Sequence, residues 1–151
     1  MTGAERLARW AHTLEPAAAD LELAHRSLLD TVAVLLAARE DPIRRALAPL
    51  SEAGQWAALA HVLDYDDLHL SSTAHISVVC VTAALGAGGD ARAYLAGAGV
   101  MARLGIALGW THYQAGWHTT CTAGAPAAAV AAGIAMGLDS RHREWPGAGP
   151  P

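Results

Sequence analysis

The sequence predicts an all-α fold, and three observations support this prediction. Apolar residues recur at intervals of three and four through most of the chain, which is the period of an amphipathic helix. Alanine is abundant and runs of β-branched residues are short. No segment alternates apolar and polar residues over the length of a half-buried strand. We therefore expect a bundle of packed helices.

The N-terminal part of the chain is expected to form four of these helices. Residues 4–13 form a short first helix, and Pro16 precedes a longer second helix. The core-facing stripe of the second helix comprises Leu21, Ala24, Leu28, Val32 and Leu35. Asp41 is the expected N-cap of a third, short helix, which Pro49 closes. Residues 56–65 supply the fourth helix.

The C-terminal part is expected to form three helices of small residues. The apolar pattern of residues 76–85 is compatible with a buried helix or a strand. The glycine-rich segment that follows, residues 86–89, is typical of a helix end and favours a helix. Asp90 is the expected N-cap of a long helix over residues 91–108. Its glycines should allow the last helix, residues 119–137, to approach closely and to lie buried among its neighbours. The glycines expected to allow this approach are Gly97, Gly105 and Gly109.

The chain is expected to form one helical domain over residues 1–139, followed by a disordered tail over residues 140–151. Its 151 residues are 53% hydrophobic and 16% charged, a composition that supports a sizeable core. The tail is instead rich in proline, glycine and charged residues, which favour neither a helix nor a strand.

Charge and cysteine usage exclude several classes of partner and location. The formal net charge is -4 without a basic cluster, which argues against nucleic-acid binding. Cys80 and Cys121 lack the paired spacing of disulfide frameworks, and residues 1–10 lack the apolar stretch of a signal peptide, so we expect a cytoplasmic protein. Residues 111–138 contain no charged side chain, but they are too rich in Ala, Gly and Thr to predict a membrane span.

Residues 61–69 concentrate three carboxylates at the expected C-terminal end of a helix, where the helix dipole disfavours negative charge. Asp64 and Asp67 are three residues apart, so in a helical turn each disfavours ionisation of the other. Three histidines are near enough in sequence to interact with them: His61, His69 and His75. In the structural interpretation, Asp66 and Asp67 cap the next turn and the histidines bond backbone carbonyls. We favour a functional role for the cluster as a unit, because unfavourable electrostatics are typical of active sites.

The same segment leaves a metal-binding interpretation open. The candidate ligands for a metal hydrolase would be Asp64, Asp67, His69 and His75. Their spacing matches no standard metal site, so we favour a site without metal.

A second candidate site surrounds His118, at the expected start of the last helix. Free backbone N–H groups and the positive end of the helix dipole make such a position suitable for an anion. Thr119 and Thr120 add hydroxyl groups, so the site is suited to a substrate carboxylate. The structural alternative is a histidine packed in the core beside Trp117.

At these two segments the sequence resembles the MmgE/PrpD family, which includes 2-methylcitrate dehydratase and cis-aconitate decarboxylase. Family members carry His-x-hydrophobic-Asp-aromatic-Asp-Asp, then a loop with His-Pro, and later Gly-aromatic-His-x-Thr before an Ala-rich helix that ends in Gly-Leu-Asp. The matching positions here are residues 61–67, His75, residues 116–120 and residues 137–139. The resemblance extends over roughly residues 5–139.

The resemblance implies an all-α domain whose active site, in complete members, faces a smaller α+β lid, usually within a homodimer. It also implies lyase chemistry on small polycarboxylates without a metal or another cofactor. Asp64 and His75 match catalytic positions, Asp64 as an acid–base or orienting group and His75 as a proton donor. His118 matches a substrate-binding position, and we expect Asp67 and Thr119 to contribute to substrate binding.

The sequence also departs from the family pattern. Leu68 stands where many members have Thr, and Ile76 stands where they have Pro after the loop histidine. Family members continue through a lysine-bearing segment and the lid, so we expect a truncated homologue that is inactive alone and needs a homodimer or a complementing chain. The alternative is a non-catalytic helical module for dimerisation or carboxylate binding.

Overall fold

The computed structural model describes residues 1–138, and in this range it contains seven helices and no strand. The predicted all-α fold is confirmed. In chain order the helices are α1 (Gly3–His12), α2 (Ala18–Ala37), α3 (Arg44–Leu47), α4 (Glu52–His61), α5 (Ile76–Gly86), α6 (Ala91–Gln114) and α7 (Thr119–Ala135). The tail predicted for residues 140–151 lies outside the described residues.

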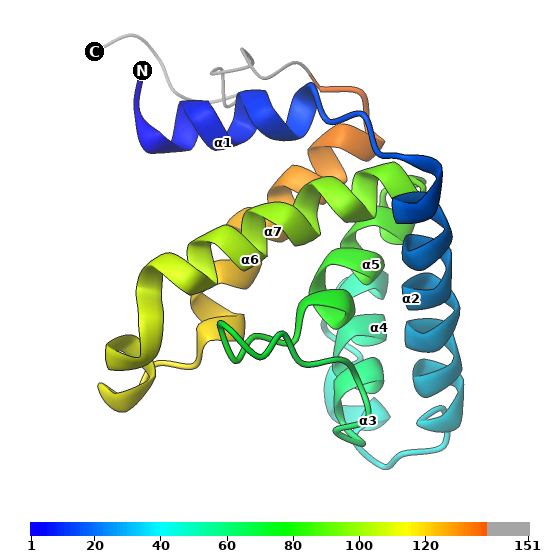
Figure 1. Cartoon of the computed structure of the whole chain (residues 1–151). Helices are drawn as coiled ribbons and strands as arrows, with labels where there is room; N and C mark the ends of the chain where they lie inside the picture. The colour runs from blue at the N-terminus through cyan, green and yellow to red at the C-terminus, as the bar shows by residue number, and fades with distance from the viewer. Residues whose placement is uncertain (139–151) are drawn as a thin grey trace, which may run out of the picture.

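The core lies where α5, α6 and α7 pack against one another. Helices α2 and α4 cover one side of this group (Figure 1), and α1 packs against α6 around Ala96 and Val100. The most deeply buried side chains include Cys80 and Val81 from α5, Met101 from α6 and Ala127 from α7. Burial of these apolar groups is the main driving force for the arrangement.

The predicted core stripe of α2 is right at four positions and wrong at one. Ala24 is buried, Leu21 and Leu28 pack against the main core, and Leu35 packs against a smaller cluster around Ala38. Val32, in contrast, is 37% exposed. Thr31 is buried in its place, and it is tolerated there because its hydroxyl donates to the carbonyl of Ser27 at 2.8 Å.

Helix α4 begins and ends four residues earlier than predicted. Ser51 caps it by accepting a hydrogen bond from the backbone N–H of Gly54, so the helix starts at Glu52 and not at residue 56. It ends at His61, and Asp64 then adopts a left-handed conformation with φ 55°. The boundaries predicted for this element were therefore wrong. The N-cap predicted for the preceding helix is wrong. Helix α3 starts at Arg44 with Ile43 as its N-cap residue, and Asp41 accepts from the N–H of Ile43 in the turn before the helix.

Helices α5 and α6 confirm two predictions and correct a third. Residues 76–86 are helical, so the strand alternative is wrong, and Asp90 caps α6 by accepting from Arg92 and Ala93. The helix was predicted to end at residue 108. The chain instead kinks at Gly109, where φ is 66°, and α6 continues to Gln114.

The three glycines of α6 named in the prediction have different roles. A Cβ at Gly97 would lie 2.8 Å from Cβ of Ala131, which confirms close packing against α7 at this position. A Cβ at Gly105 would lie 2.6 Å from Cβ of Ser72, so this glycine admits mainly the α4–α5 loop. Gly109 has no such neighbour, and its role is to allow the kink. The predicted packing of all three glycines against α7 is correct only in part.

Helix α7 is buried on one face only, although the sequence predicted burial among its neighbours. Ala123, Ala127 and Ala131 are at most 1% exposed, while Ala125 and Ala129 on the other face are exposed. Within the described range, α6 is the one helix long and apolar enough to cross a membrane by length and composition. A single helix of this kind is weak evidence for a span, because helices in the core of other proteins pass the same test.

Candidate active site

The acidic segment lies on the loop that joins α4 to α5. A backbone bridge between His69 and Ala74 closes the second half of this loop. Asp64 and Thr73 both adopt positive φ, at 55° and 52°, which turns the chain sharply at the two ends of the loop. Such strained positions persist only where the surrounding contacts fix them, and they are frequent at functional sites.

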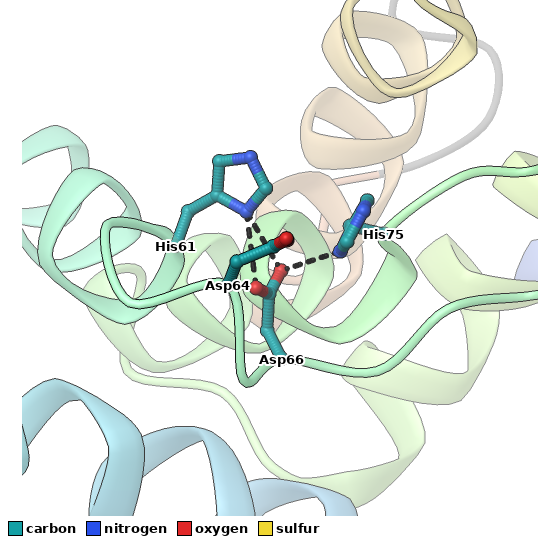
Figure 2. A group of neighbouring side chains, drawn as sticks. All are labelled: His61, Asp64, Asp66 and His75. Atoms are coloured by element: carbon teal, nitrogen blue, oxygen red, sulfur yellow. Dashed lines mark hydrogen bonds and ion pairs between the residues drawn. The ribbon is translucent and has the colours of Figure 1, made fainter.

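The carboxylate of Asp66 is the buried centre of the site. Its side chain is 1% exposed, and both its oxygens accept a hydrogen bond from Nδ1 of His61 at 3.0 Å. Nδ1 of His75 also lies 3.0 Å from Asp66 Oδ2, but outside hydrogen-bonding geometry, so this contact is electrostatic. Figure 2 shows the two imidazole rings on either side of the Asp66 carboxylate. Asp66 therefore contacts the Nδ1 atom of both rings.

His75 is fixed by its backbone as well as by Asp66. It is the residue before α5, and its N–H donates to Oγ1 of Thr120 at 2.9 Å. This bond joins the acidic loop to the first turn of α7 across 45 residues of sequence. Because Nδ1 faces Asp66, the geometry of the ring directs Nε2 away from that carboxylate, where it is available for proton transfer.

His75 lies close to both Asp64 and His118. A carboxylate oxygen of Asp64 and a nitrogen of His75 are within 4.8 Å of each other, and the rings of His75 and His118 stack with centroids 6.2 Å apart. His118 is the N-cap residue of α7, which confirms its expected place at a helix start. A hollow of about 250 Å³ beside it is lined by Tyr113, Gly116, Trp117 and His118.

Asp67 and Thr119 do not join this group. The carboxylate of Asp67 accepts hydrogen bonds from the backbone N–H of Ser77, at 2.9 Å, and from its hydroxyl, so it caps the first turn of α5. Thr119 is 1% exposed, and its methyl group packs towards Gly105. Their substrate-binding roles are not supported by these positions, and the structural interpretation of Asp67 as a cap is correct.

The set of metal ligands considered from the sequence is also not brought together. Nδ1 of His69 bonds the hydroxyl of Ser72 at 2.7 Å, and Asp67 is engaged by Ser77. A different group gathers among the described residues, with one ligand atom each within 4.8 Å of the others: His61, Asp64, Asp66 and His75.

Below the site, Asp67 influences two buried titratable groups of the core. Desolvation, followed by the negative charge of Asp67, raises the pKa of the Cys80 thiol to about 12. Desolvation likewise raises the pKa of Tyr94, against hydrogen bonds from Ser27 and Ser77 that lower it. Both groups remain protonated at neutral pH and belong to the structural core.

Sequence reasoning left three contributors out of the site. Asp66 was interpreted as a possible cap, His61 as a neighbour of the acidic cluster, and Thr120 as one hydroxyl of an anion site. The spacing of His61 and Asp66 was visible, but which of three neighbouring carboxylates is buried depends on how the loop folds against α5 and α7.

Comparison with known proteins supports this organisation of the chain. No match was found among curated proteins or among solved structures. The family model described as MmgE/PrpD N-terminal domain matches residues 43–145, which is more than half of the chain. This range contains both motifs, the acidic loop and the His118 segment. On the strength of this match and the all-α fold, the chain belongs to the MmgE/PrpD family.

Proposed function

We propose that this chain supplies the acid–base part of a lyase active site for small polycarboxylates, of the 2-methylcitrate dehydratase or cis-aconitate decarboxylase type. The observation that carries the proposal is the position of His75 against a carboxylate with 1% exposure. A carboxylate beside one imidazole nitrogen fixes the orientation of the ring and leaves the other nitrogen for proton transfer. The histidine is thereby prepared for general acid–base catalysis.

The neighbouring groups suggest a division of roles. His75 donates a proton to the leaving hydroxyl, or to the carbon from which carbon dioxide departs. Asp64, within 4.8 Å of the histidine, abstracts a proton or orients the group that does so. His118 binds a substrate carboxylate at the N-terminus of α7, where the helix dipole favours negative charge. Asp66 and Thr120 position His75.

The negative charge of the substrate indicates that these groups need positively charged partners from elsewhere. Polycarboxylate substrates carry several negative charges, and electrostatic stabilisation of the transition state often contributes more to catalysis than any other effect. The two arginines of α6 are committed elsewhere: Arg92 donates to backbone carbonyls of His12 and Leu14, and Arg103 stacks on Trp10 with 3.9 Å between its Cζ and the ring centroid. We therefore propose that cations come from a complementing chain or domain, within a homodimer or a larger assembly, in the cytoplasm.

A non-catalytic module for dimerisation or carboxylate binding is the second candidate. The observation that favours it is a group of exposed apolar side chains on the kinked end of α6 and after it: Ile106, Trp110, Tyr113 and Trp117. Exposed aromatic groups of this kind are typical of interfaces. In this case, His118 would bind a carboxylate without any reaction.

Two measurements test the proposal. The purified chain is expected to show no turnover of 2-methylcitrate or cis-aconitate alone, since the two arginines of α6 are engaged away from the site. A chimera in which residues 43–138 replace the equivalent segment of a complete family enzyme should show turnover, and His75→Ala in the chimera should reduce kcat by about 100-fold or more. His25→Ala, an exposed histidine on α2, is the matched control.

Two results would overturn the proposal. If a folded chimera is inactive while it still binds citrate, the non-catalytic module is favoured. If the chimera is active and insensitive to His75→Ala, the assigned proton donor is wrong.

A further inference from the structure

We propose that Tyr94 is a positioning residue for His75, acting through Ser77 and Asp67, which hold the loop that carries Asp66. The catalytic part of this inference rests on the proposed acid–base role of His75. The positional part concerns only the fold, so it can be measured in the chain by itself.

A buried series of hydrogen bonds joins α6 to the acidic loop through α5. The hydroxyl of Tyr94, on α6, lies 2.9 Å from Oγ of Ser77, on α5, and both residues are buried. Ser77 in turn donates to Asp67 twice, from its hydroxyl to Oδ2 and from its backbone N–H to Oδ1. Two helices and the loop therefore meet at the hydroxyl of Ser77.

The direction of these hydrogen bonds follows from the number of protons. Ser77 has one hydroxyl proton, which it donates to Asp67, so Tyr94 must be the donor in its bond with Ser77. Tyr94 is able to donate at neutral pH because burial raises the pKa of its hydroxyl. Both hydroxyl bonds thus point towards the carboxylate of Asp67, an arrangement in which each bond strengthens the next. Removing the hydroxyl of Tyr94 is expected to weaken the hold of Ser77 on the loop.

The series of bonds ends beside the contact that orients His75. Asp67 directly follows Asp66, and Ser77 is two residues after His75. The bonds between Asp67 and Ser77 and the contact between Asp66 and His75 therefore connect the same two segments of the chain. Since the segments are joined at both places, the first connection determines how the carboxylate of Asp66 faces the imidazole ring.

The orientation of His75 is sensitive to small displacements of the loop. Its Nδ1 lies 3.0 Å from Oδ2 of Asp66, but outside hydrogen-bonding geometry. Such a contact changes steeply with angle and distance, so a small movement of Asp66 is expected to turn the ring. Proton transfer depends on the direction of the reacting nitrogen. Tyr94 therefore influences Nε2 of His75 without contact with the substrate.

The test compares Tyr94→Phe with a matched variant in the core. Tyr94→Phe keeps the aromatic ring and removes only the hydroxyl. Thr82→Val is the control, because Thr82 is another buried residue of α5 whose hydroxyl donates to the carbonyls of Val78 and Val79 in the same helix. Ser77→Ala, which interrupts the series of bonds at its centre, is the second variant and keeps the test decisive if Tyr94→Phe folds poorly.

Nitrogen-15 spectra of the histidine side chains in the full chain are the primary readout. We expect Tyr94→Phe and Ser77→Ala to shift the Nδ1 and Nε2 signals of His75, whereas Thr82→Val leaves them in place. His25, which is exposed on α2, should not respond to any of the substitutions. Unchanged His75 signals in Tyr94→Phe would overturn the inference. An equal shift in Thr82→Val would also overturn it, because it would indicate a general effect of core substitutions.

The chimera with a complete family enzyme provides the catalytic readout. Tyr94→Phe in an active chimera should lower kcat by about tenfold or more through misplacement of the ring, and it should change KM by about twofold at most. Thr82→Val should keep the parent kcat. An active chimera in which Tyr94→Phe also keeps the parent kcat would contradict the positioning role. An inactive chimera would count against the proposed function, and the histidine spectra of the full chain would then decide this inference by themselves.

Discussion

Oδ2 of Asp66 lies 3.0 Å from Nδ1 of His75, so the loop after α4 is linked electrostatically to the residue that precedes α5. The same carboxylate holds His61 at the end of α4. One buried group thus connects two helices and orients two imidazole rings.

Asp66→Asn should lower the free energy of unfolding by about 1–3 kcal/mol, because a buried carboxylate that accepts from His61 is replaced by an amide that matches the two rings poorly. Urea denaturation measures this change. Asp64→Asn is the control and should stay within about 0.5 kcal/mol, since Asp64 is exposed and Asn tolerates its positive φ. Equal effects of the two substitutions would contradict the central role of Asp66.

Thr73→Gly should stabilise the protein by about 0.5–1 kcal/mol. Thr73 holds φ at 52°, which is unfavourable for a β-branched residue, and glycine removes this strain at a smaller entropic cost. Thermal unfolding is the measurement. Ser71→Gly, an exposed position of the same loop at which φ is not positive, should leave the melting temperature unchanged or lower it. A lower melting temperature for Thr73→Gly would show that its hydroxyl bond to Ser72 outweighs the strain.

Gly105→Ala should destabilise the protein by about 1–3 kcal/mol, because the added Cβ would lie 2.6 Å from Cβ of Ser72 in a packed interface. Leucine at this position should cost more. Gly133→Ala is the matched control within a helix. A Cβ at this position would lie 4.0 Å from its nearest neighbour, so the higher helix propensity of alanine should stabilise the protein by up to about 1 kcal/mol. Chemical denaturation of both variants compares them. Unchanged stability of Gly105→Ala would show that the loop does not pack on α6.

The two cysteines should differ in reactivity. Iodoacetamide at pH 8 should modify the exposed Cys121 in the native protein and leave Cys80 unmodified, because burial raises the pKa of Cys80 to about 12. Mass spectrometry counts the adducts, and denaturant should release the second site. Native modification of both thiols at similar rates would contradict the burial of Cys80.

The raised pKa of Cys80 also predicts a pH dependence. The unfolded thiol ionises near pH 9, whereas the folded thiol stays protonated until about pH 12. The free energy of unfolding is therefore expected to fall as the pH rises between these values, and Cys80→Ala should weaken the slope. Tyr94, whose pKa burial also raises, accounts for part of the remaining slope.

The sequence by itself determined the all-α class, the N-cap at Asp90, and the family motifs. These features depend on hydrogen bonds and apolar spacing within a few residues, which sequence patterns report directly. The start of α4 was equally local, encoded by Ser51, but the prediction followed the apolar residues and missed this cap.

Only the tertiary structure decided which polar groups lie inside. Asp66 and Asp67 are adjacent and chemically identical, yet one is buried between two histidines and the other caps α5. Thr31 is buried instead of Val32 because the direction in which α2 meets its neighbours selects the buried side of the helix. Gly105 allows the close approach of Ser72, whereas Gly109 allows a kink in α6. Which of these roles a glycine has likewise depends on segments far away in sequence. Burial is a property of packed neighbours, and a local pattern cannot specify it when adjacent residues are equally suited to either environment.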